Sequence, residues 1–135
     1  MTRRFLLLPL CLLAVGACKN TNGPTIYSTA GSWRSQDFAP ASVQVTLVET
    51  ARSTTGAGRW LTGADANAFL VDGAHSDSTV SLLFDFHGSR PDITFEGRFR
   101  KQDAGGKNVT VMAGHLYGGE FRGETFVFVP DENPQ

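Results

Sequence analysis

Three histidines, His75, His87 and His115, are the side chains of this chain best suited to act as general bases or metal ligands. His75 and Asp77 lie beside a predicted turn, and His87 lies at the far end of the strand that follows. In a hairpin these two histidines would lie at opposite ends, too far apart to share one metal ion. His115 belongs to the outward-facing phase of its strand. We therefore expect solvated histidines and no metal site.

The residue pattern does not indicate nucleophilic or acid–base catalysis either. No serine lies in a Gly-x-Ser-x-Gly turn, and the pattern suggests no histidine and aspartate partners for a serine nucleophile. The carboxylates in or near predicted strands are scattered, and nothing brings two of them together for glycoside chemistry. They are Asp72, Asp85, Glu96, Glu120 and Glu124. We predict no catalytic residue, no cofactor and a protein that is not an enzyme.

Arg98, Arg100 and Lys101 form a basic stripe that extends to Arg122 on a neighbouring strand. Such a stripe would suit lipid headgroups or an acidic partner. Nearby glutamates would neutralise it, namely Glu96, Glu120 and Glu124. We interpret the stripe as a solvated face of ion pairs, because a run of charges most often marks such a face.

β-Strands must position these side chains, because apolar residues recur at every second position. Residues 79–87 and 93–100 alternate most cleanly, and residues 43–48 and 126–129 show the same period. Their predicted inward phase comprises Val43, Val45, Leu47, Val80, Leu82, Phe84, Phe86, Ile93, Phe95, Phe99, Phe126 and Phe128. The polar residues between them indicate a sheet with one buried face and one face exposed to solvent.

Turn-forming residues divide the chain at regular intervals into about eight strands of ordinary length. They fall at residues 51–55, 63–67, 75–78, 88–92, 103–107 and 118–119. Sequential antiparallel strands joined by short turns form a meander, and closure of the meander removes exposed edges. We predict an all-β fold, an antiparallel up-and-down β-barrel. A two-sheet sandwich is the alternative, but it usually needs longer crossing connections.

A glycine precedes a large apolar residue by two positions at several places in the predicted strands. The pairs are Gly58 with Trp60, Gly97 with Phe99, and Gly114 with Leu116. Small and large side chains on one inner face fit the taper of a small barrel. The phenylalanines favour a filled interior and the glycines favour a gap, so the spacing leaves both open.

The N-terminal residues end in a cysteine that follows small residues. Arg3 and Arg4 precede an apolar stretch over residues 5–15, and Val15-Gly16-Ala17-Cys18 closes it. The segment resembles a bacterial lipoprotein signal peptide with its lipobox. The resemblance implies cleavage between Ala17 and Cys18, and lipidation of Cys18, for example with palmitate, as the new N-terminus that anchors the protein to a membrane.

Other interpretations of this segment fit less well. A spanning helix needs about 20 apolar residues, and this stretch is shorter and contains Pro9. An ordinary cleaved signal that happens to precede a cysteine is the second alternative. The Arg3-Arg4 pair is similar to a twin-arginine signal but lacks its spacing, which favours the Sec route. Lys19, in place of an aspartate, would favour the outer membrane in enterobacterial lipoproteins.

The remainder of the chain resembles the small lipocalin-like and avidin-like barrels. Gly31-Ser32-Trp33 is similar to their first strand, whose Trp plugs one barrel end, and Phe95 to Phe99 matches a Phe-x-Gly-x-Phe strand of meander-barrel lipoproteins. The resemblance implies the fold only. Avidins use several interior tryptophans for biotin, whereas this chain has only Trp33 and Trp60, so we expect no biotin site.

These observations divide the chain into four parts. We expect a signal peptide over residues 1–17, a lipidated N-terminus and flexible linker over 18–30, the barrel over 31–130, and a disordered tail over 131–135. Loss of Arg3 and Arg4 leaves 10 basic against 13 acidic residues, a formal net charge of −3, which does not favour nucleic acid. Cys11 leaves with the signal, so no disulfide remains.

We therefore expect a lipid-anchored protein of the cell envelope, on the periplasmic face of the outer membrane or on the cell surface. Its first predicted function is a non-enzymatic binding module for a small apolar ligand inside the barrel. The predicted lining residues are Trp33, Trp60, Phe84, Phe86, Phe95, Phe99, Phe126 and Phe128. The alternative is a structural or protein-interaction lipoprotein with a packed core, no ligand and an envelope protein as partner.

Overall fold

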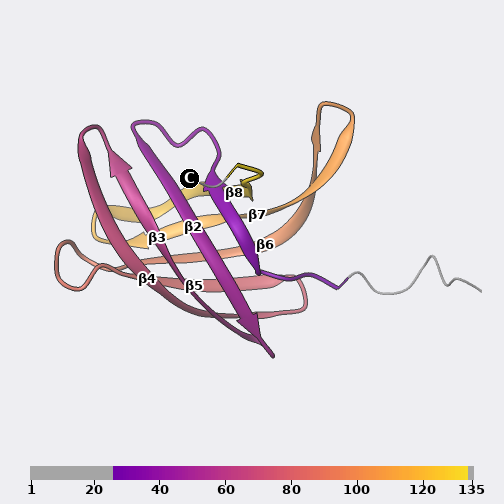
Figure 1. Ribbon diagram of the computed structural model, residues 1–135, viewed down its shortest axis with the longest axis horizontal. Coiled ribbons are helices and arrows are strands. Elements are labelled where there is room, and N and C mark those ends of the chain that lie inside the picture. The colour runs from indigo at the N-terminus through magenta and orange to yellow at the C-terminus, as the bar shows by residue number, and fades with distance from the viewer. Residues whose placement is uncertain (1–25, 134–135) are drawn as a thin grey trace, which may run out of the picture.

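The computed structural model describes residues 26–133, which fold into a closed eight-stranded antiparallel barrel (Figure 1). Each strand pairs with the next, and β1 pairs with β8, so the order around the barrel is the order along the chain. The strands are β1 (Gly31–Ser35), β2 (Ala41–Thr50), β3 (Ser53–Thr62), β4 (Asp65–Ser76), β5 (Thr79–Asp85), β6 (Ile93–Ala104), β7 (Lys107–Gly118) and β8 (Phe121–Pro130). The predicted up-and-down barrel is confirmed, and the sandwich alternative is wrong.

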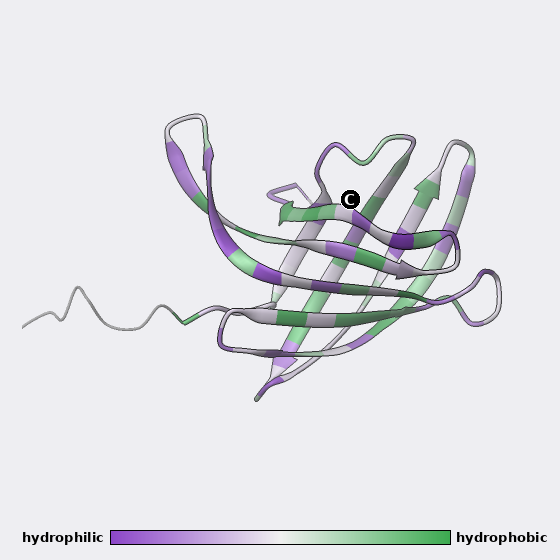
Figure 2. Cartoon of the chain, turned by 180° about the vertical axis from the view of Figure 1, so that it is seen from behind, coloured by the Kyte–Doolittle hydropathy of each residue, from purple (hydrophilic) through white to green (hydrophobic). Residues whose placement is uncertain are grey.

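Alternation of side chains along each strand decides which of them enter the barrel. Leu82 of β5 lies opposite Phe95 of β6, and both side chains are fully buried. The hydropathy of β2, β5 and β6 alternates accordingly along the chain (Figure 2). A slip of one residue in this register would turn the whole apolar face to solvent, so the period of two specifies the pairing strongly.

The barrel has two ends, which the hairpin turns and the N-terminal segment define. The β2–β3, β4–β5 and β6–β7 turns lie at the end where β1 begins, and residues 26–30 lead into β1 there. We call residues 26–30 the N-terminal strap and this end the strap end. The β1–β2, β3–β4, β5–β6 and β7–β8 connections lie at the other end, on the left of Figure 1, which we call the aromatic end.

The β6–β7 hairpin extends beyond its neighbours at the strap end (Figure 1). β5 pairs with β6 only as far as Arg98, and β8 pairs with β7 only from Met112. Residues 100–111 therefore project from the barrel. Gly97 and Gly114 lie opposite each other at the base of this projection, and a Cβ on Gly114 would overlap the backbone of its partner strand. The two glycines permit the close approach there.

Within residues 26–133 there is no helix with the length and apolarity required to span a membrane. The predicted signal peptide and cleavage site, with Ala17 and Cys18, lie outside the described residues. So does the first part of the predicted linker, residues 18–25. Its last part does contact the barrel, because Thr29 is fully buried and Tyr27 stacks on Phe99.

Candidate functional site

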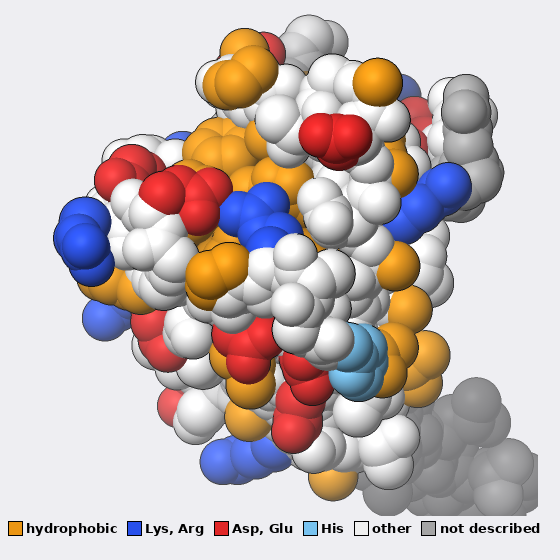
Figure 3. Space-filling view, turned by 90° about the vertical axis from the view of Figure 1, so that its left-hand side faces the viewer, with side chains coloured by type: hydrophobic (Ala, Val, Ile, Leu, Met, Phe, Trp, Pro, Cys, Tyr) orange, Lys and Arg blue, Asp and Glu red, His pale blue; other side chains and the backbone are white. Residues whose placement is uncertain are grey.

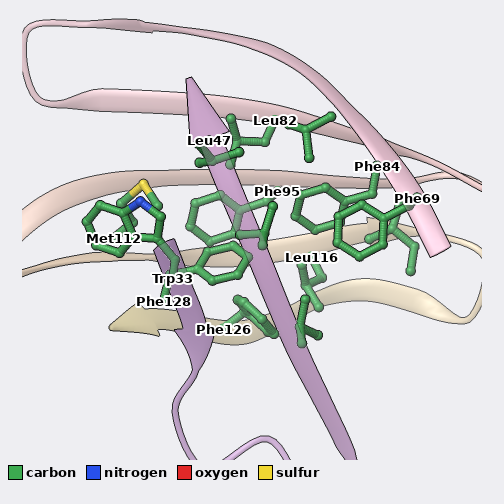
Figure 4. Close-up of a cluster of buried hydrophobic side chains, with 14 of the residues drawn as sticks. Trp33, Leu47, Phe69, Leu82, Phe84, Phe95, Met112, Leu116, Phe126 and Phe128 are labelled. Atoms are coloured by element: carbon green, nitrogen blue, oxygen red, sulfur yellow. The ribbon is translucent and has the colours of Figure 1, made fainter. Parts of the chain in front are cut away.

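The residues predicted to line a ligand space all lie inside the barrel, and Figure 4 shows part of this cluster. None of them exposes more than 5 % of its surface. They are Trp33, Trp60, Phe84, Phe86, Phe95, Phe99, Phe126 and Phe128. The structure thus brings together the complete predicted set, together with Phe69, whose ring centroid lies 4.8 Å from that of Phe84.

These aromatic rings pack against one another instead of lining a space between them. Phe126 and Phe128 meet edge to face with centroids 4.7 Å apart, and Phe95 lies 5.4 Å from Phe128. The rings also cover the strand glycines: a Cβ on Gly97 would lie 2.5 Å from the Phe95 ring. Such distances are those of favourable aromatic pairs in a close-packed interior. Of the two alternatives for the barrel interior, the structure therefore favours one filled by side chains over one with an open space, at least in the middle of the barrel.

The aromatic end is closed by rings that come from four different connections or strands. Trp60 of β3 contacts Phe38 of the β1–β2 loop edge to face at 5.7 Å, Phe86 at 6.2 Å and Phe121 of β8 at 5.6 Å. Trp60 and Phe86 are buried, whereas Phe38 and Phe121 are half-buried and lie at the surface. The chain thus presents an aromatic surface at this end.

Arg90 of the β5–β6 loop lies over this aromatic cluster. Its guanidinium carbon is 4.9 Å from the Trp60 ring centroid and 5.0 Å from that of Phe86, and the side chain is only 16 % exposed. Nη2 also donates to Glu120 Oε1 at 2.8 Å. A cation over two aromatic faces is stabilised by the ring quadrupoles, so Arg90 holds the loop down on the rings.

Carboxylates surround the aromatic end. They come from the β1–β2 loop, the start of β4, the end of β5, the β5–β6 loop and the β7–β8 turn. They are Asp37, Asp65, Asp85, Asp92 and Glu120. Figure 3 shows this side of the molecule, with acidic side chains spread around an apolar patch. Arg122, near the start of β8, lies at the same end. The end therefore combines an apolar centre with a rim in which acidic side chains predominate, the acidic rim.

The strap end contains polar groups inside the barrel. Glu49 of β2 and His75 of β4 both lie on the inward phase of their strands, and Glu49 Oε1 contacts His75 Nδ1. Their side chains are 14 % and 11 % exposed. Our prediction of a solvated His75 is wrong, because the inward phase of β4 continues past Val71 and Gly73 to His75. The same alternation could have placed Glu49 inside, beyond Leu47.

The N-terminal strap closes this end by binding the same carboxylate. Ser28 Oγ donates to Glu49 Oε2 at 2.8 Å, and Thr29 Oγ1 donates to Oε1 at 3.3 Å. Thr29 has a single hydroxyl proton, so the 2.6 Å bond between Thr54 and Thr29 is donated by Thr54. The Trp33 indole donates to the Thr29 carbonyl at 2.8 Å. The strap is therefore tied down by directional hydrogen bonds.

This arrangement positions the strap and does not activate a nucleophile. The Ser28 hydroxyl bonds to the carboxylate and not to the His75 imidazole, so no base accepts its proton in the way that a serine triad requires. Thr29 and Thr54 bond to each other or to Glu49. Within the described residues, the polar partners of the Glu49 carboxylate, Ser28, Thr29 and His75, thus all belong to the closure of the barrel end.

The other two histidines lie apart from this cluster. His87 is 63 % exposed and its Nδ1 lies 3.8 Å from Asp85 Oδ2, and His115 is exposed with Nδ1 3.1 Å from the Gly123 carbonyl oxygen. The prediction of solvated side chains is confirmed for both. Among residues 26–133, no group of three or more His, Cys, Asp or Glu side chains is arranged to hold a metal ion.

The scattered carboxylates have separate partners. Glu96 accepts from Ser81 at 2.7 Å, and Glu124 accepts from the backbone N–H of Arg122 at 2.6 Å. Glu120 pairs with Arg90. The ion pairs within the described part of the chain do not include Arg98, Arg100 or Lys101. The predicted ion pairs between these glutamates and the stripe are therefore not formed. The predicted extension of the stripe to Arg122 is wrong, because Arg122 pairs with Tyr117 at the aromatic end.

Comparisons of the chain with protein-family models, with curated proteins and with solved structures gave no match. Function must therefore be inferred from the filled barrel, its two differently closed ends and the N-terminal residues. Arg90, Phe38, Phe121 and the Glu49–His75 pair are the features that the sequence-based prediction missed.

Proposed function

We propose that this protein is a lipid-anchored envelope protein whose barrel acts, without catalysis, as a protein-interaction module with a filled interior. The observation that carries the proposal is the packing of the predicted lining aromatic residues against one another. A lipocalin-like barrel that binds a ligand keeps a space inside. Here rings occupy that position, so recognition falls to the outer surface and the ends.

The anchor is supported by the N-terminal sequence and by where the strap lies. Basic residues, a short apolar stretch and Val15-Gly16-Ala17-Cys18 have the form of a lipoprotein signal. Cys18 precedes Ile26 by eight positions, a separation that spans at most about 28 Å when fully extended. A lipid on Cys18 would thus keep the strap end close to the membrane and turn the aromatic end away from it.

The aromatic end is then the surface offered to a partner. Phe38 and Phe121 present half-buried rings, and the acidic rim around them would attract cationic side chains. Aromatic residues are typical anchors at the centres of protein interfaces. We propose an envelope protein with a basic and apolar contact segment as the partner.

A dye that brightens in apolar pockets tests the filled interior, with a fatty acid as competitor. The wild-type protein should give no saturable, displaceable signal. Phe128→Ala, which empties ring volume at the centre of the barrel, should give one, provided that near-ultraviolet circular dichroism shows a folded protein; Leu82→Ala serves if it does not. Saturable binding by the wild type would instead support the apolar-ligand function.

Site-specific photo-crosslinking in cells tests the interaction surface. A crosslinker at exposed Ala39, in the β1–β2 loop beside Phe38, should give a discrete adduct with one envelope protein. The same group at exposed Val48, on the outer wall of β2, is the matched control and should not. Equal adducts at both positions, or none at Ala39, would contradict the proposed surface.

A small apolar ligand remains the second candidate function. The half-buried rings Phe38 and Phe121 favour it, since both lie against Trp60 and their displacement would expose interior apolar surface. This function requires the aromatic end to open, which the dye experiment would detect as binding by the unmodified protein.

A further inference from the structure

The β6–β7 hairpin carries a basic surface at the strap end. Arg98, Arg100, Lys101 and Lys107 lie on or near it and are exposed, and Asp103 is the only acidic residue among residues 98–110. Asp131 and Glu132, which follow β8, lie beside the hairpin and line a pocket with its Gln102 and Val109. Asp103 Oδ1 accepts the Gly106 N–H within the turn, at 3.0 Å. No ion pair within the described residues engages Arg98, Arg100 or Lys101, so the four basic side chains of the hairpin stay free to meet an anionic surface and outnumber the acidic residues Asp103, Asp131 and Glu132 beside them.

A groove separates this hairpin from the N-terminal strap. It has a volume of about 540 Å³ and is lined on one side by Ile26 and Tyr27 and on the other by Lys101, Val109 and Thr110. The Ile26 side chain is 92 % exposed. Lys101 Nζ donates to Thr110 Oγ1 at 2.8 Å, which holds the ammonium group at the edge of the groove. Apolar and cationic groups therefore lie side by side.

We propose that the strap end docks on an anionic lipid surface, with the β6–β7 hairpin as its electrostatic contact and the groove beside Ile26 as its apolar contact. The inference rests on the lipid anchor proposed above, because the chain between Cys18 and Ile26 is short enough to bring this end to the membrane. Basic residues near an anionic surface and exposed apolar residues at the same place are the features of interfacial binding.

Charge on the rest of the molecule favours the same orientation. The aromatic end carries five carboxylates around its rings, against the two arginines Arg90 and Arg122. The carboxylates are Asp37, Asp65, Asp85, Asp92 and Glu120. An anionic bilayer would repel the aromatic end and attract the hairpin. Both interactions favour the orientation in which the strap end faces the bilayer. Docking would thus orient the barrel on its tether and expose the aromatic end.

The test uses the full chain, lipidated in cells and reconstituted into vesicles, with one added thiol carrying an environment-sensitive dye. Asn108→Cys, next to the β6–β7 turn, reports docking, and Asp65→Cys at the aromatic end is the control; both positions are exposed. The dye on Asn108→Cys should be shielded on vesicles of phosphatidylcholine with phosphatidylglycerol, but not on phosphatidylcholine alone. The dye on the control variant, Asp65→Cys, should remain exposed to water on both kinds of vesicle.

Docking should weaken with each basic residue that is removed from the hairpin. Each Lys or Arg beside an anionic surface favours binding about five-fold, so Lys101→Gln and Lys107→Gln together should lower the ratio of docked to undocked protein about 25-fold. Salt at about 1 M should also lower the ratio of docked to undocked protein, because it shortens the electrostatic screening length to about 3 Å. Thr62→Gln, at the opposite end, is the matched substitution and should have no effect.

Two results would overturn the inference. One is a dye on Asn108→Cys that stays in water on anionic vesicles. The other is shielding that appears only when an acidic polypeptide such as polyglutamate is added, which would make an acidic protein the occupant. Flotation of the same protein with vesicles, compared with Cys18→Ala, tests the anchor separately. Failure of the wild-type protein to float contradicts the proposed function, whereas flotation without shielding contradicts only the docking.

Discussion

At the strap end, Glu49 and His75 bring a carboxylate and an imidazole inside the barrel, and the hydroxyls of Ser28 and Thr29 cover them. At the aromatic end, rings fill the opening and the Arg90 guanidinium lies across them. Hydrogen bonds are directional, so the first closure allows one position for the strap. Aromatic packing is less directional, so the second closure tolerates another ring in place of Phe38 or Phe121.

This difference explains how one small barrel can present two kinds of surface. The hydrogen-bonded end determines where the N-terminal chain leaves the barrel, and therefore how the barrel would sit on the proposed anchor. The aromatic end retains half-buried rings at its surface, which the proposed partner could cover without breaking a buried polar network. Substitutions at the two ends should therefore have different effects on stability and on the position of the strap.

The largest effect should come from the centre of the aromatic end. Trp60→Ala removes a buried ring that packs on Phe86, Phe121 and the Arg90 guanidinium, and should lower the free energy of unfolding by about 3–5 kcal/mol. Denaturant unfolding of the full chain measures it. Tyr27→Ala at the strap end is the control, since its ring is only partly buried. Equal losses for the two variants would mean that the aromatic end is no more dependent on its rings than the strap end.

A smaller effect should follow from the carboxylate at the strap end. Glu49→Gln keeps the shape but removes the charged acceptor shared by His75, Ser28 and Thr29, and should cost about 1–3 kcal/mol. A double-mutant cycle with His75→Gln should give a coupling energy of about 0.5–3 kcal/mol, because the two groups are in contact. Hydrogen exchange should show the strap amides opening faster. Additive losses would indicate that the pair does not hold the strap.

The smallest effect should come from the cation at the aromatic end. Arg90→Met keeps the apolar stem but removes the guanidinium, and should lower stability by about 1 kcal/mol. In a Trp33→Phe background, Trp60 is the only tryptophan, so its emission should shift when the charge above it is lost. Arg34→Met, on the exposed outer face of β1, is the control. Unchanged Trp60 emission would argue against a contact between the guanidinium and the ring in solution.

Much of the fold followed from local patterns, because alternation is a property of neighbouring residues. The period of two in β5 and β6 placed Leu82 and Phe95 inside correctly. The spacing of Gly97 and Gly114 fitted a small barrel, but the close approach of these two glycines to each other came only from the structure. His75 was misjudged because its neighbour Asp77 lies in a turn, although β4 keeps its phase to within one residue of the strand end. Arg90 gave no signal, since a loop residue has no phase.

Sequence alone determined the approximate strand count, most of the inward apolar set and the form of the N-terminal segment, because each depends on residues close together in the chain. Only the tertiary structure decided that Glu49 meets His75 and that Arg90 covers Trp60, because these contacts depend on the register of several strands and on closure between β1 and β8. It also decided that rings fill the interior. Volume is shared among all strands, so no single stretch of sequence specifies whether a space is left between them.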